Sequence, residues 1–141
     1  MKSKLVIDTN ILLDLLVFDD QRAHPLRTAL NESQVIALGS SYTVAEFLDV
    51  IARPQFNLDR EAQTKAHQQL LAWLTLEHDE AVETAPWKCK DKDDQIYLNL
   101  AFSHRPCTLL SKDKQVLKLA KRARQCGVVI TNDHNKFLLA L

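Results

Sequence analysis

The sequence predicts an α/β protein of three layers, α/β/α, in which helices cover both faces of a central, mostly parallel sheet of four to five strands. Short apolar segments of strand length alternate along the chain with longer segments whose apolar residues recur at helical spacing. The 141 residues suffice for one domain, and a composition of 46% hydrophobic and 26% charged residues is that of a globular protein. We therefore expect residues 1–141 to form a single domain.

The chain opens with a strand that leads directly into a helix. Residues 4–7 are mostly apolar, and the apolar side chains across residues 11–16 have the spacing of one helix face. A second helix is expected over residues 25–31. Residues 35–38 then predict a strand, which Gly39-Ser40-Ser41 should end with a turn that also caps the next helix.

Further helices and strands alternate to the end of the chain. One helix follows Ser41 and stops at Pro54, and another, capped by Asp59, is expected over residues 58–76. The remaining predicted elements are a short strand at 80–83, a helix that begins at Asp91 or Asp93, strands at 107–110 and 128–130, a helix at 116–123 and a terminal helix from Asn132.

Composition limits the function classes. The formal net charge is zero, so any affinity for a polyanion must come from local patches rather than from the whole surface. Three cysteines without a C-x-x-C pair indicate reduced thiols rather than a disulfide framework or a zinc site. Apolar runs are too short to span a bilayer, and the first residues lack a cleavage-site pattern, so we expect a cytoplasmic protein with no membrane partner.

Acidic residues gather at one predicted edge of the sheet. Asp8 follows the first strand and Asp113 follows the strand at 107–110, so both belong at the carboxyl ends of parallel strands, where ligand sites form. The cluster of Asp91, Asp93 and Asp94 begins a helix that can face the same edge, and Glu46 lies one turn into the helix after the second strand.

Each of these carboxylates alone could simply cap a helix, which stabilises by roughly 0.3–1 kcal/mol. Several carboxylates converging on one edge would repel one another unless cations neutralised them. Their hard oxygen atoms suit Mg²⁺ or Mn²⁺.

Four segments carry motifs in order along the chain. They are Val6-Ile7-Asp8-Thr9-Asn10-Ile11-Leu12, Thr43-Val44-Ala45-Glu46-Phe47-Leu48, Cys89-Lys90-Asp91-Lys92-Asp93-Asp94-Gln95-Ile96-Tyr97-Leu98 and Leu110-Ser111-Lys112-Asp113. Together they resemble the PIN-domain family, and the third is similar to the C-x-D-x-x-D stretch of a prokaryotic subgroup of VapC-like toxins. The correspondence runs from Val6 to about Leu138. It departs from the subgroup at Lys92, where proline is common, and at Gln95, where Asp or Asn is common.

The resemblance implies a PIN-like fold and a ribonuclease that depends on Mg²⁺ or Mn²⁺. Asp8, Glu46, Asp94 and Asp113 would be catalytic. The metal ligands it implies are Asp8, Asp94 and Asp113, with Glu46 and Asp91 as further candidates. The implied partners are an RNA substrate, a cognate antitoxin protein and a second copy of the chain.

Supporting roles are predicted for a few neighbours of these carboxylates. Asn10 and Ser111 are placed to hydrogen-bond the carboxylates, although either could equally cap a helix or close a turn. Lys112, Lys114 and Lys118 are candidates for RNA contact, in a basic segment whose Lys114, Lys118, Lys121 and Arg122 should share a helix face; an ordinary solvated face is the alternative.

Two other functions stay open from the sequence. A catalytically weak PIN scaffold would bind RNA or a protein without cleavage, which the altered third motif allows. A receiver-like phosphotransfer domain is disfavoured, because its phospho-accepting Asp should follow a middle strand, whereas residues 35–38 lead into Gly39-Ser40-Ser41.

Overall fold

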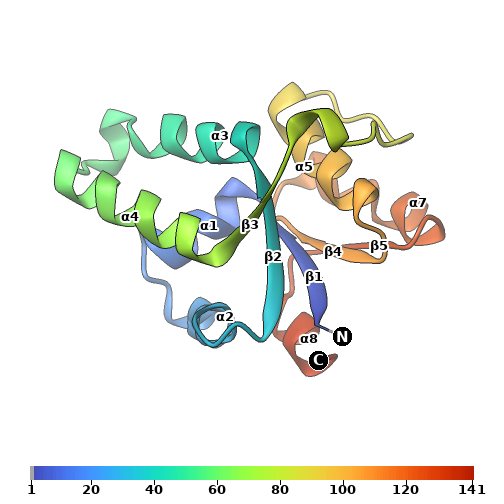
Figure 1. Ribbon diagram of the computed structural model, residues 1–141, viewed down its shortest axis with the longest axis horizontal. Coiled ribbons are helices and arrows are strands. Elements are labelled where there is room, and N and C mark those ends of the chain that lie inside the picture. Colours follow the sequence, from blue (N-terminus) through green and yellow to red (C-terminus); the bar gives the residue numbers. More distant parts are fainter. Residues whose placement is uncertain (1) are drawn as a thin grey trace.

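The computed structural model describes residues 2–141 and contains one five-stranded sheet in the order β3-β2-β1-β4-β5 (Figure 1). Every neighbouring pair is parallel. The strands are β1 (Ser3–Ile7), β2 (Val35–Ser40), β3 (Leu74–Glu77), β4 (Cys107–Leu110) and β5 (Val128–Thr131). With helices on both faces of this sheet, the predicted α/β fold is confirmed.

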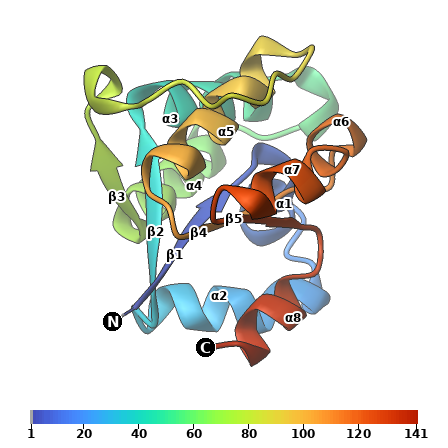
Figure 2. The same ribbon diagram turned by 90° about the vertical axis from the view of Figure 1, so that its right-hand side faces the viewer.

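The two faces bury separate hydrophobic clusters. One face is covered by α1 (Thr9–Leu16), α2 (His24–Asn31), α3 (Ser41–Ile51), α4 (Arg60–Trp73) and α8 (His134–Leu139). The other is covered by α5 (Lys92–Ser103), α6 (Lys114–Leu117) and α7 (Ala120–Gln125) (Figure 2). Three short 3₁₀ helices lie in the connections, η1 (Gln21–Ala23), η2 (Pro54–Phe56) and η3 (Asp79–Ala81).

Strand β1 lies at the centre of the sheet and serves both clusters. Its side chains alternate between faces, so Leu5 and Ile7 pack under α1 and α3 while Val6 packs under α5. All three are at most 5% exposed. A strand buried on both faces reads as a continuous apolar run, which is why residues 4–7 predict it well.

The third strand differs from the prediction. The helix expected over 58–76 ends at Trp73, and Leu74 turns to an extended backbone so that β3 can pair with the free edge of β2. Because Gly39 lacks a side chain, Leu74 can pack directly against β2 there. Residues 80–83, expected to be a strand, instead begin within η3 and lead toward α5 (Figure 1).

Three smaller boundaries also change. Strand β2 continues through Gly39 to Ser40, whose hydroxyl caps α3 as expected. The helix predicted at 116–123 breaks at Lys118–Leu119, and Val116, Leu119 and Ala123 are buried against the sheet. Asp91 caps α5, and Asp133 rather than Asn132 caps α8.

No helix within residues 2–141 combines the length and apolarity needed to cross a membrane. Cys89, Cys107 and Cys126 are free thiols, of which only Cys107 is fully buried.

The strand order reverses beside β1. From β1 the chain builds outward through β2 to β3, and it then returns to the other side of β1 to add β4 and β5. In parallel sheets a crevice for ligands opens at the carboxyl ends of the strands where such a reversal occurs. Here that place lies between the ends of β1 and β4.

Candidate active site at the carboxyl edge

Asp8 lies where β1 and β4 end side by side. Ile7 pairs with Leu110, and the Asp8 amide donates to the Leu110 carbonyl at 2.9 Å. The Asp8 side chain, only 3% exposed, caps α1: its Oδ1 accepts from the Thr9 amide at 2.7 Å. Its Oδ2 accepts from the Ser111 hydroxyl at 2.6 Å. Both carboxylate oxygens therefore have a protein donor.

Ser111 and Asn10 tie the loop after β4 to the start of α1. The Ser111 hydroxyl oxygen accepts from the Asp113 amide at 3.1 Å and from the Asn10 side-chain amide at 3.5 Å. The Asn10 side-chain oxygen accepts from the Lys112 amide at 3.0 Å. Ser111 thus contacts Asp8 directly, whereas Asn10 acts on it through Ser111.

Asp113 and Asp94 begin two helices that point at the same edge. Asp113 caps α6 and accepts from the Gln115 amide at 2.8 Å. Asp94 lies in the first turn of α5, which Asp91 caps by accepting from the Asp93 amide at 2.9 Å. The positive end of a helix dipole favours such carboxylates.

The pKa values show that these carboxylates are close neighbours. Burial, together with the charges of Asp8, Asp113 and Asp91, raises the pKa of Asp94 to about 7. Burial likewise raises the pKa of Asp8 to about 6, although the hydrogen bonds from Ser111 and Thr9 oppose the shift. The structure therefore brings Asp8, Asp94 and Asp113 together, with Asp91 beside them.

Glu46 lies at the margin of this cluster. It is half-buried in α3, and its pKa is raised first by burial and then by Asp93, while Arg53 lowers it. Its acidic neighbours are thus at the start of α5 and on α3. Glu46 faces the cluster through the α3–α5 contact rather than through β1.

Tyr97 reaches the site from the core, which the sequence did not indicate. The side chain is 2% exposed, and its hydroxyl shares a hydrogen bond with the Thr9 hydroxyl, next to Asp8. Burial raises the pKa of Tyr97, and the charges of Asp8, Glu46 and Asp94 raise it as well. The Tyr97 hydroxyl is therefore near all three carboxylates.

Gln95, which departs from the family pattern, holds the chain that precedes Asp91. Its amide donates to the Trp87 carbonyl at 3.0 Å and to the Asn99 side chain at 2.9 Å, and its oxygen accepts from the Cys89 amide at 2.7 Å. Lys92, the other departure, is exposed at the first position of α5. Gln95 and Lys92 thus lie beside the acidic edge, and neither forms a hydrogen bond with Asp8.

Among the predicted RNA-contacting lysines, Lys112 forms an ion pair with Asp14, which is not one of the predicted site residues. Asp14, 8% exposed, was missed by sequence reasoning, though an acid inside the apolar run 11–16 was a usable signal. Lys114 and Lys118 are exposed. The prediction that they share one continuous helix face is wrong, because α6 ends at Leu117.

The donor set fits a hard divalent cation. Within residues 2–141 no group of three or more His, Cys, Asp and Glu side chains is already placed to hold a metal ion. Mg²⁺ requires only one or two carboxylates, because it keeps several of its waters. The neighbouring carboxylates of Asp8, Asp94 and Asp113 offer that number of hard oxygen ligands.

Comparisons with known proteins agree with this architecture. A family model described as PIN domain matches residues 4–115, a range that includes Asp8, Glu46, Asp94 and Asp113. Six chains of solved structures match, among them VapBC2 from Rickettsia felis, solved bound to a DNA fragment from its promoter. That likeness has a TM-score of 0.61 at 12% identity and covers 92% of this chain and 99% of that chain. No curated protein matches the sequence.

Proposed function

The chain belongs to the PIN-domain family, and on this premise we propose that it is an endoribonuclease that depends on Mg²⁺ or Mn²⁺ and cleaves single-stranded or structured RNA. The observation that carries the proposal is the convergence of Asp8, Asp94 and Asp113 at the point where the strand order reverses. Carboxyl groups whose pKa values are raised by burial and by like charges mark a site prepared for a cation or a proton.

Asp8, Asp94 and Asp113 would hold the ion, with Asp91 and Glu46 able to contribute. A divalent ion held there would supply Lewis acidity, which activates water and offsets the charge of the phosphate. Asp8 is the most rigid of the three ligands, because Thr9 and Ser111 fix both of its oxygens.

Other residues would position the substrate and the water. Glu46 is half-buried and has a raised pKa, so it is suited to orient a water or to accept its proton. Lys114 and Lys118 are exposed on the segment that Asp113 begins, and they would contact the RNA backbone. The zero net charge leaves this task to local groups.

We also propose a biological role as the toxin of a toxin–antitoxin pair, which acts in the cytoplasm as a homodimer restrained by a cognate antitoxin. Support comes from the third motif and from the fold shared with the VapBC2 structure. Fold alone does not determine function, so this role depends on the family.

A catalytically weak scaffold that binds RNA or a protein is the second candidate. The observation that favours it is the absence, within residues 2–141, of side chains already arranged as a ligand cage. Calorimetry separates the two functions. The nuclease should bind Mn²⁺ and lose that binding on Asp94→Asn, whereas a scaffold should give no metal-binding heat in either form.

The direct test incubates purified protein with single-stranded and hairpin RNAs in Mg²⁺, Mn²⁺ or EDTA. Asp8→Asn should abolish the metal-dependent cleavage. Asp59→Asn is the control, since Asp59 is also a helix-capping aspartate, at the start of α4, and Asn is an equally good cap. Intact RNA under all metal conditions, or equal cleavage by Asp8→Asn and wild type, would disprove the nuclease assignment.

A further inference from the structure

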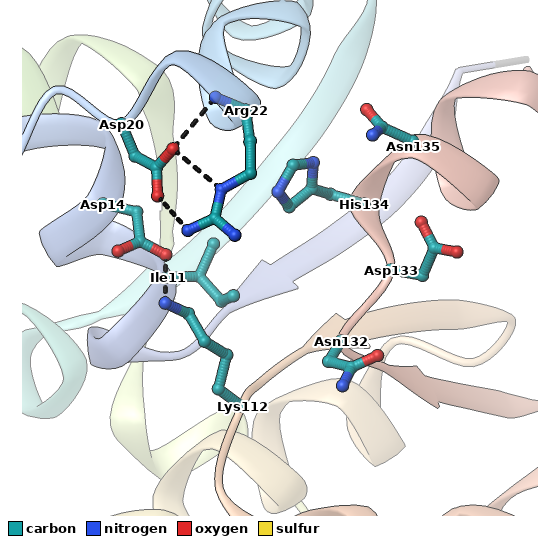
Figure 3. Close-up of a pocket in the computed structure, with 9 residues that line it drawn as sticks. All are labelled: Ile11, Asp14, Asp20, Arg22, Lys112, Asn132, Asp133, His134 and Asn135. Atoms are coloured by element: carbon teal, nitrogen blue, oxygen red, sulfur yellow. Dashed lines mark hydrogen bonds and ion pairs between the residues drawn. The ribbon is translucent and has the colours of Figure 1, made fainter.

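A second polar site adjoins the acidic cluster. A pocket of about 350 Å³ lies between α1, the η1 segment and the start of α8 (Figure 3). Ile11 lies between the Lys112–Asp14 pair and the imidazole of His134, which extends from α8 toward Arg22. The volume is at the lower end of the range for small-molecule sites.

Two short chain segments connect the pocket to the acidic cluster. Ile11 follows Asn10, and Lys112 lies between Ser111 and Asp113. Because consecutive Cα atoms are only about 3.8 Å apart, an RNA strand whose phosphate lies at the cluster could place a neighbouring nucleotide here.

The cations of the pocket are already neutralised. Lys112 pairs with Asp14, and Arg22 makes two side-chain hydrogen bonds to Asp20, at 2.9 and 3.2 Å. Asp133 adds another negative charge to the lining. A phosphate would have to displace these carboxylates, so the pocket favours a neutral occupant.

The groups left for such an occupant are two amides and an imidazole. Among residues 2–141, the side chains of Asn132 and Asn135 form no hydrogen bond, and the His134 ring, whose Nδ1 is buried, lines the pocket without a hydrogen-bond partner. An amide offers both a donor and an acceptor, and an imidazole nitrogen can serve as either. This combination of planar ring and mixed hydrogen-bonding groups is the chemistry that reads the edge of an unstacked nucleobase.

We propose that this pocket binds one unpaired nucleobase of the RNA, next to the scissile phosphate, and so sets the base preference of cleavage. The inference rests on the proposed ribonuclease function. Asn132, His134 and Asn135 would determine specificity, while Asp8, Asp94 and Asp113 perform the chemistry. Lys112 joins the two sites because its side chain lines the pocket and its backbone amide is held by Asn10.

The first test is the sequence preference of cleavage. Wild type, His134→Ala and Asn132→Ala/Asn135→Ala are incubated with a pool of random-sequence RNA, and the ends of the products are sequenced. Loss of an edge contact should reduce the preference for the favoured base about tenfold, as expected for hydrogen bonds to a base edge. His78→Ala, an exposed histidine near the opposite edge of the sheet, is the control and should keep the wild-type preference.

The second test does not depend on activity. In Asp8→Asn protein, the imidazole proton resonances of the five histidines are followed by NMR while a random-sequence RNA octamer is added. The His134 signal, assigned by its loss in His134→Ala, should shift more than the other four. An absence of any cleavage by wild type would refute the nuclease function and not this site. Cleavage with unchanged preference in both pocket variants, or an unmoved His134 signal, would refute the nucleobase site. The occupant of the pocket would then be a protein side chain rather than a base.

Discussion

Replacing Asp8 with Asn should remove activity and yet stabilise the metal-free protein at alkaline pH. In the folded protein the pKa of Asp8 is about 6, against an ordinary value of 3.8. A carboxyl whose folded pKa is raised contributes stability that is fully present below pH 3.8 and lost as the pH rises through about 6. Two pKa units correspond to about 3 kcal/mol, so at pH 8 the ionised Asp8 destabilises the metal-free fold by that order.

Asparagine is neutral and avoids this cost. It keeps the acceptor for the Thr9 amide, but it replaces the acceptor for the Ser111 hydroxyl with an amide NH₂ group. Losing that hydrogen bond costs about 1 kcal/mol. The net gain in the free energy of unfolding should be about 1–2 kcal/mol at pH 8, which raises Tm by about 5 °C for a domain of this size.

Thermal unfolding at pH 5 and pH 8, in EDTA and in Mg²⁺, measures this directly. In EDTA, Asp8→Asn should melt above wild type at pH 8, and the difference should disappear or reverse at pH 5. Mg²⁺ should stabilise only the wild type and Asp59→Asn. A variant that melts below wild type at pH 8 in EDTA would show that the ionised Asp8 does not destabilise the metal-free fold. The electrostatic argument for a cation site would then fail.

Other substitutions test the surroundings of the cluster. Ser111→Ala removes a hydrogen bond that lowers the pKa of Asp8, so the acid limb of the cleavage pH profile should move to higher pH, while Thr108→Ala, on strand β4 just before Ser111, should leave it in place. Gln95→Ala removes three hydrogen bonds, two of them to the loop before α5, and should lower the free energy of unfolding by about 1–3 kcal/mol in urea titrations; an unchanged midpoint would refute its role as the anchor of that loop. Mn²⁺ affinity should fall as the pH drops from 8 to 6, because Asp94 with a pKa of about 7 must lose its proton, and calorimetry in buffers of different ionisation enthalpy should show proton release; pH-independent binding would contradict this.

The positions of the acidic residues could be predicted because each depends on local signals. Asp8 directly follows the apolar strand β1. Asp113 caps a helix that begins soon after the apolar strand β4. Parallel strands bring their carboxyl ends to one edge, so recognising the strands was sufficient to group these residues.

The features that the sequence did not reveal depend on contacts between distant segments. Strand β3 continues from α4 without a break, and only the free edge of β2 makes Leu74 extended. The ion pair of Lys112 with Asp14 and the hydrogen bond of Tyr97 with Thr9 join residues about a hundred positions apart. Local propensity carries no information about such pairs.

The measurement that tests the central claim most directly is the anomalous diffraction of a crystal of this protein soaked in Mn²⁺, under conditions in which the protein cleaves RNA. We predict a manganese peak within ligand distance of Asp8, Asp94 or Asp113, and its loss in Asp94→Asn. Manganese bound elsewhere, or cleavage with no peak at this edge, would contradict the account.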